Sequence, residues 1–133
     1  MTTQVFVNLP VTDLDRSVAF YEAVGFRVVE AMRDDTAAGM VVDEGVHLML
    51  LTTPFYERFT TRRVADAHES SQVIVAITAE SDEAVDALAD RAVAAGAEAA
   101  TYGMEVPGMH GRAFADPDGH QWEVFHTAEG FTG

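Results

Sequence analysis

The 133-residue sequence contains no cysteine and only 8 basic residues against 22 acidic ones, so its formal net charge is −14. Without cysteine the chain can form no disulfide, no thiolate nucleophile and no cysteine-ligated zinc site. Without a run of basic residues it lacks the positive patch that nucleic acids and anionic membranes require. We therefore expect an acidic protein that binds neither of them.

Long apolar runs are also missing. No stretch of about 18 apolar residues occurs, and the first ten residues lack the basic start and apolar core of a secretory signal. The GxSxG and HExxH motifs and a phosphate-binding glycine loop are absent as well, which excludes several common enzyme classes. These absences lead us to expect a soluble protein of the cytoplasm.

The two halves of the chain repeat one order of strand and helix signals. In the first half, VFVNLP alternates like a strand, Asp13 is a candidate helix N-cap, and Gly25 is a helix stop. In the second half, a β-rich run precedes Ser81 or Asp82 as the cap, and Gly96 is the stop. Each half therefore contains a predicted strand followed by a helix.

Further strand patterns follow each helix. The predicted strands cover roughly residues 27–31, 38–43 and 46–52 in the first half and 72–78, 98–102, 110–115 and 120–126 in the second. The sequence thus predicts two βαβββ modules of an α+β fold, at about 4–53 and 71–127. In the connector 54–70, Thr53 before Pro54 favours a capped short helix. Because neither module can bury enough surface alone, we expect one domain over residues 1–133.

Alternation along the strands predicts which side chains face the helices. Leu48 and Leu50 in one strand, and Trp122 and Val124 in another, are the apolar set that belongs against the helices. The residues predicted to share the opposite face are Phe6, Asn8, His47, Met49, Gln72, Glu123 and Phe125. A face that is half apolar and half polar is typical of a small-molecule cleft.

The phrases VNLPVTDLDRSVAFYEAVGF and GRAFADPDGHQWEVF, set within two βαβββ modules, resemble the vicinal oxygen chelate superfamily over nearly the whole chain. That superfamily includes glyoxalase I, the bleomycin-resistance proteins and the extradiol dioxygenases. The resemblance implies a cup-shaped mixed sheet with the helices on its convex side, and a homodimer. In members with a metal, ligands project from the first and last strands of both modules; bleomycin-resistance members bind the drug in the same cup without metal.

The resemblance assigns the last metal ligand to Glu123, four positions after the glycine of DPDG. The remaining family positions fall on Phe6, on Gln72, and on Met49 or Leu50. Phenylalanine cannot coordinate an ion, and His47 is one same-face step from Met49, a shift of about 6.6 Å. We therefore expect the standard four-ligand site to be incomplete. The alternative is a site for zinc, nickel, manganese or iron formed by Glu123, Gln72 and His47.

Two interpretations of Glu123 remain open. If the hairpin at DPDG has no bulge, Glu123 lies opposite Arg112, and a cross-strand ion pair accounts for it. If it lines a cleft, it is a candidate general base, assisted by His47 or His110, for proton abstraction next to a carbonyl in a lyase or isomerase step. Otherwise His110 and His120 are expected in loops or turns. The DPDG sequence is itself expected to form a structural turn in which Gly119 adopts a left-handed conformation.

Three functions follow from these observations. The first is a glyoxalase or bleomycin-resistance-like protein that binds a small molecule in the cup, with or without catalysis. Its predicted ligand contacts are Phe6, Asn8, Met49, Gln72, Phe125, Glu123 and Arg112. The second is a metal-dependent lyase, isomerase or dioxygenase that uses Glu123, Gln72 and His47. The third is an interaction module whose cup is filled by side chains and whose role is dimerisation.

Overall fold

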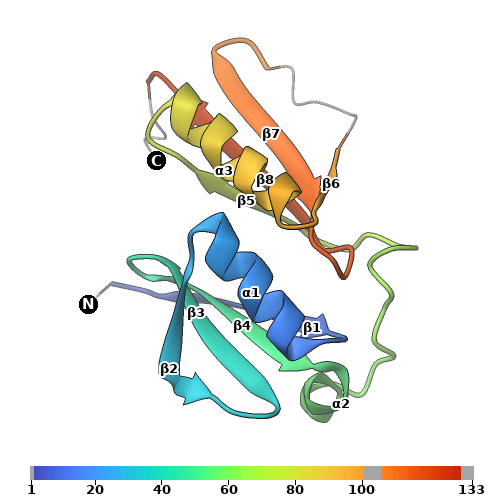
Figure 1. Cartoon of the computed structure of the whole chain (residues 1–133). Helices are drawn as coiled ribbons and strands as arrows, with labels where there is room; N and C mark the ends of the chain where they lie inside the picture. Colours follow the sequence, from blue (N-terminus) through green and yellow to red (C-terminus); the bar gives the residue numbers. More distant parts are fainter. Residues whose placement is uncertain (1, 101–105, 130–133) are drawn as a thin grey trace. The chain divides into compact units, whose positions relative to one another are not determined.

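The computed structural model describes residues 2–100 and 106–129, and the chain forms two compact units, residues 1–66 and 67–133 (Figure 1). The first unit contains β1 (Val5–Val11), α1 (Leu14–Val24), β2 (Arg27–Arg33), β3 (Ala37–Asp43), β4 (Val46–Thr52), α2 (Thr53–Tyr56) and the 3-10 turn η1 (Glu57–Phe59). The second contains β5 (Ile74–Thr78), α3 (Asp82–Ala94), β6 (Glu98–Ala99), β7 (Met109–Ala115) and β8 (Gln121–Thr127). The predicted βαβββ order is confirmed in both halves.

Both units have the same sheet topology. In the first, the strand order is β1-β4-β3-β2, with β1 parallel to β4 and the other pairs antiparallel. In the second, the order is β5-β8-β7-β6, and β5 is parallel to β8. The parallel pair needs a crossover, which α1 or α3 supplies. Each module thus forms a four-stranded mixed sheet of its own.

The long helices begin and end at residues that the sequence indicated. Asp13 accepts a hydrogen bond from the Arg16 backbone N–H at 3.1 Å, and Gly25 ends α1 with a φ of 120°. Ser81 accepts from the Ala84 N–H at 3.0 Å, so Ser81 and not Asp82 is the cap of α3. Gly96 follows α3 with a φ of 111°. A β-carbon is disfavoured at such positive φ, which explains both glycines.

Alternate strand residues pack against the helices, as predicted. Leu48 and Leu50 of β4 are fully buried in the first unit, β4 contacts α1, and Tyr21 and Val24 of α1 are fully buried as well. In the second unit, Val124 packs with Val85 and Ala89 of α3, and Trp122 stacks on Phe114 with ring centroids 6.4 Å apart. Each buried Val or Leu side chain contributes roughly 1.5–3 kcal/mol to folding. The residues between them in each strand consequently lie on the other face of the sheet.

Three local predictions require correction. Strand β5 begins only at Ile74, so Gln72 lies in a bend outside this strand. The reason is that β8, the strand that pairs with β5, begins at Gln121, which lies opposite Ile74. Thr53 is the first residue of α2 rather than its cap, and its hydroxyl donates to the Val11 carbonyl at 3.3 Å. Strand β6 ends at Ala99; the predicted continuation to 102 reaches residues 101–105, which lie outside the described residues.

No helix within the described residues has the length and apolar character needed to cross a membrane.

Candidate functional site

The open face of each sheet, meaning the face turned away from α1 or α3, carries the predicted site residues of that unit. On the first sheet, Phe6 is paired with His47 and Asn8 with Met49 on adjacent strands. These positions alternate with the buried Leu48 and are themselves exposed or half-buried. The structure therefore brings together the four residues that the sequence assigned to one face of this module.

The Phe6 and His47 side chains are stacked on this face. Their ring centroids are 4.5 Å apart and their planes differ by 12°. Phe6 remains 46% exposed although it is a large apolar residue. The side-chain amide of Asn8 donates a long hydrogen bond of 3.4 Å to the Phe6 carbonyl. The first open face therefore combines a ring stack with an amide that retains hydrogen-bonding capacity.

Sequence reasoning missed Met32 on the same open face. Gly39 is paired with Met49, and a β-carbon built on Gly39 would approach the Met32 side chain to 3.0 Å. Met32 therefore lies over Gly39 and is 44% exposed. The available signal was a glycine inside a strand, which often marks close approach by another group.

On the second sheet, the open face carries Gln121, Glu123 and Phe125. Glu123 lies between Ala76 of β5 and Ala113 of β7, directly opposite both in register. Methyl groups therefore flank the half-buried carboxylate across both neighbouring strands. This row offers Glu123 no cross-strand polar partner, and it leaves space above two small residues.

The predicted ion pair between Arg112 and Glu123 is wrong. Arg112 lies opposite Val124, and Ala113 lies opposite Glu123. The turn contains one residue more than the DPDG phrase suggests, because the Asp116 N–H donates to the His120 carbonyl at 2.9 Å. The Asp116 Oδ1 atom also accepts from the His120 N–H at 2.8 Å. That extra residue shifts the register by one and places Arg112 on the α3 side of the sheet.

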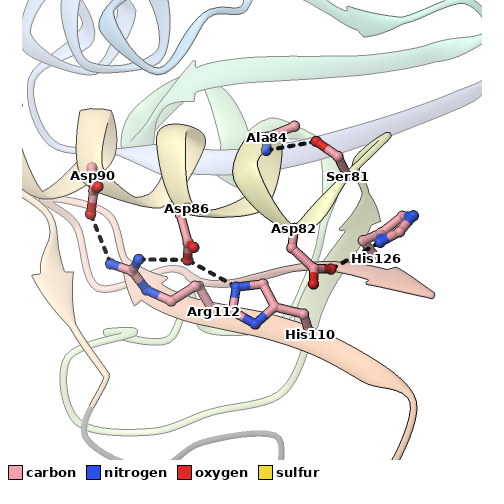
Figure 2. A network of polar contacts seen from close by, with 8 residues as sticks. All are labelled: Ser81, Asp82, Ala84, Asp86, Asp90, His110, Arg112 and His126. Atoms are coloured by element: carbon pink, nitrogen blue, oxygen red, sulfur yellow. Dashed lines mark hydrogen bonds and ion pairs between the residues drawn. The ribbon is translucent and has the colours of Figure 1, made fainter. Parts of the chain in front are cut away.

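Arg112 instead binds the helix. Its guanidinium donates to Asp86 at 3.0 Å and to Asp90 at 3.1 Å (Figure 2). The hydrogen bonds that Arg112 donates to Asp86, and then to Asp90, raise the pKa of Arg112 above its ordinary value. The guanidinium is therefore bound to two α3 carboxylates on the face opposite to Glu123.

Two histidines join this set of contacts. His110 Nε2 lies 2.9 Å from Asp86 Oδ1, and His126 Nδ1 lies 3.0 Å from Asp82 Oδ1 (Figure 2). The expectation that His110 is a loop residue is wrong, because it lies in β7 and faces α3. Hydrogen bonds from His110, and then from Arg112, hold the pKa of Asp86 below its usual value. We call Asp82, Asp86, Asp90, His110, Arg112 and His126 the α3 network.

The α3 network was missed from the sequence, although it has a pattern. Asp82, Asp86 and Asp90 recur every four residues, which places them on one side of the helix. That spacing suggests a solvated charged face as readily as a docking face. The basic partners come from two other strands and cannot be identified without the register. The network attaches α3 to its sheet.

The DPDG turn is structural, as expected. Gly119 has a φ of 90°, and the Asp116 carboxylate, only 3% exposed, accepts from the N–H groups of Asp118 and His120. His120 lies in this turn, as predicted. These contacts fix the start of β8 and so determine that Glu123 faces away from α3.

A hollow of about 540 Å³ lies beside the N-terminus of α1. Three of its four acidic side chains have local roles; among them, Asp13 caps the helix, and Asp15 pairs with Arg33 at 3.1 Å. Hydrogen bonds from Thr36 lower the pKa of Asp34, which organises the turn between β2 and β3. The arrangement accounts for these carboxylates without a ligand.

The residues at the family's metal-ligand positions do not fit its four-ligand site. Phe6 presents a carbon ring that is already stacked on His47, and Met49 offers only a thioether. Gln72 lies outside β5 and is exposed. Within the described residues of either unit, no three His, Asp or Glu side chains gather closely enough to hold a metal ion.

Known proteins share both sequence and fold with this chain. Residues 3–124 match the family model described as Glyoxalase/Bleomycin resistance protein/Dioxygenase superfamily. No curated protein matches. Among solved structures, hypothetical protein SA1046 from S. aureus is 24% identical, with 94% of both chains covered and a TM-score of 0.77. A glyoxalase/bleomycin resistance protein/dioxygenase from Nocardioides is 26% identical, with 99% of this chain and 87% of that chain covered and a TM-score of 0.72.

A third similar structure holds a metal. FosX, the genomically encoded fosfomycin resistance protein of Listeria monocytogenes, complexed with Mn(II) and sulfate, is 18% identical. The match covers 96% of this chain and 92% of that chain, with a TM-score of 0.72. At this identity the likeness concerns the fold alone.

Proposed function

Because the chain belongs to the Glyoxalase/Bleomycin resistance protein/Dioxygenase superfamily, we propose that it binds a small molecule on the open faces of its sheets, the surfaces predicted to line a cleft. We further propose that it does so without the standard four-ligand metal site, as a cytoplasmic homodimer. The observation that carries the proposal is the position of Glu123 between Ala76 and Ala113.

A carboxylate between two alanines, as Glu123 is, can recognise a bound molecule by accepting a hydrogen bond from it. The flanking methyl groups neither donate hydrogen bonds to Glu123 nor fill the space beside it. A bound molecule with a cationic or N–H group would therefore find an acceptor whose charge-assisted hydrogen bond is stronger than one between neutral groups. Phe125, two residues further along β8, adds apolar surface on the same face.

The open face of the first sheet supports the same function. Phe6 and Met49 supply apolar area, whereas Asn8 and His47 supply groups that donate or accept hydrogen bonds. Binding sites for small organic molecules have this composition, with apolar walls and a few polar groups that fix the orientation. Because the two units are similar in topology, each offers one such face.

If the bound molecule is also converted, Glu123 is the proposed general base. It would accept a proton from a carbon next to a carbonyl, as in a lyase or isomerase step, with His47 assisting. A carboxylate-to-amide change removes the base and keeps the shape. A pH–rate profile that is the same in Glu123→Gln and in the unmodified protein would exclude this role.

Binding is tested by thermal shift against a small-molecule library. A ligand present at about 100 times its Kd stabilises the native state by roughly 2.7 kcal/mol, which raises the melting temperature by on the order of 10 °C. We expect Glu123→Gln to lose most of that rise for ligands with a cationic or N–H group. Glu30→Gln, which changes an exposed strand glutamate of the first unit, is the matched control and should retain it.

The metal content of the protein and its molecular mass in solution distinguish the two other functions, a metal-dependent enzyme and an interaction module. Protein purified without chelator should contain no stoichiometric zinc, nickel, manganese or iron. An ion that is bound in the unmodified protein and lost in both Glu123→Gln and His47→Leu would establish the metal-dependent alternative. A dimer that no library compound stabilises would support the interaction module.

A further inference from the structure

We propose that the first open face selects planar aromatic or heteroaromatic molecules, which stack on the outer side of the Phe6 ring. The inference rests on the proposed small-molecule function and specifies its ligand class. It starts from three observations in the first unit: the parallel Phe6–His47 stack, the edge position of β1, and the exposure of Phe6.

The stack fixes the direction in which the Phe6 ring faces. Phe6 and His47 are direct partners on adjacent parallel strands, which lie about 4.8 Å apart. Their centroid separation of 4.5 Å and nearly parallel planes mean that the two rings are stacked face to face. The stack runs across the sheet, from one strand to the next. One face of the Phe6 ring is therefore covered by the imidazole.

Among the described strands of the first unit, none lies beyond the other face of Phe6. In the sheet order β1-β4-β3-β2, β1 is an edge strand, so the row ends at Phe6. The 46% exposure of Phe6 agrees with one covered and one uncovered face. A third flat ring can extend the stack at the same spacing, whereas a saturated ring cannot approach the π surface as closely because its hydrogens project from the plane.

Asn8 adds a polar contact beside this position. It follows Phe6 by two residues on the same face of β1, a separation of about 6.6 Å along the strand. Its amide donates to the Phe6 carbonyl at 3.4 Å, which is long for an N–H···O hydrogen bond and is easily exchanged for a better acceptor. An aromatic ring that bears a carbonyl or amide substituent would stack on Phe6 and accept a hydrogen bond from Asn8.

The test compares a flat probe with its saturated counterpart. We choose naphthalene-2-carboxamide and decahydronaphthalene-2-carboxamide, because both are neutral and avoid repulsion from a chain of net charge −14. Calorimetry should show roughly two- to tenfold tighter binding of the flat probe, the range typical of one aromatic pair. Upfield shifts of its ring protons in NMR spectra should report the stacking directly.

Variants separate the ring from apolar bulk. Phe6→Leu keeps an apolar side chain and should reduce the affinity ratio of the two probes to about one, whereas Phe6→Tyr should preserve it. Phe59→Leu removes a ring that is 69% exposed in η1, away from the sheet, and should leave the ratio unchanged. Asn8→Ala should weaken both probes by the same factor.

Each contrary result has a defined meaning. Equal affinities for the two probes, or a ratio that survives in Phe6→Leu, would overturn the aromatic preference. The aromatic preference would also be overturned if Phe6→Leu converted a dimer into a monomer, because that result would mean that the Phe6 ring contacts a second copy of the chain and not a ligand. If neither probe binds but another compound does so in a Glu123-dependent manner, the inference fails and the proposed function stands. If no compound binds, both fail.

Discussion

The turn before β8 provides the sharpest test of the structure, through Gly119→Ala. A β-carbon at Gly119 would lie 2.7 Å from the His68 backbone nitrogen and 2.8 Å from the Ala67 carbonyl carbon. Backbone atoms cannot rotate away as a flexible side chain can. Since φ at Gly119 is +90°, alanine there is also strained irrespective of its surroundings.

The two effects have separable magnitudes. Forcing an L-residue into a left-handed conformation costs roughly 1–2 kcal/mol. Overpacking against a well-fixed backbone adds roughly 1–3 kcal/mol. Gly119→Ala should therefore lower the free energy of unfolding by about 2–5 kcal/mol. Gly96→Ala is the matched control, because φ there is +111° and no described atom lies within 4 Å of the added carbon. It should lose only about 1–2 kcal/mol.

Urea unfolding followed by the fluorescence of the single tryptophan, Trp122, measures both variants, because this buried residue reports on the second unit. The informative quantity is the difference between the two alanine variants. Equal destabilisation of Gly119→Ala and Gly96→Ala would refute the close approach between the turn and residues 67–68. The strain at positive φ would then account for both.

Three further outcomes are expected. Because the native pKa of Asp86 is lowered, its charge stabilises the fold above the unfolded-state pKa, and this contribution is lost as the pH falls through the native pKa. Between about pH 6 and about pH 3, the urea midpoint of Asp86→Asn should therefore fall less than that of the unmodified protein. Parallel plots of urea midpoint against pH for the two proteins would contradict this. Ser81→Ala should lower the free energy of unfolding by about 1 kcal/mol in urea titrations by loss of the α3 cap, and a value near zero would contradict the cap. Glu123→Gln should change that free energy by less than about 0.5 kcal/mol, since alanines flank the carboxylate; a larger loss would show a structural role.

The fold was largely predictable because its signals are local. Caps such as Asp13 and Ser81 act within three residues, and a positive φ at Gly25 or Gly96 is a property of one residue. Strand parity follows from alternation within a single segment, and it correctly separated Glu123 from Trp122 and Val124. These features need no information about distant parts of the chain.

The partners of Arg112 were not predictable because they depend on a count across a turn. With a loop of four residues Arg112 would face Glu123, and with five it faces Val124 and α3. Sequence composition does not distinguish the two, since the choice is made by the hydrogen bonds between Asp116 and His120. A shift of one residue moved the guanidinium to the opposite side of the sheet and revealed the α3 network.

The two long helices are attached to their sheets by different means, and the surrounding solution therefore acts on them differently. Helix α1 buries two aromatic side chains of its own, Phe20 and Tyr21, whereas α3 buries only one valine and two alanines and relies on partly exposed pairs of opposite charge. Dissolved ions weaken attraction between exposed charges, but strongly hydrated salts strengthen apolar association. Concentrated sulfate should accordingly strengthen the apolar packing of α1 on its sheet and weaken the ion pairs that attach α3 to its sheet.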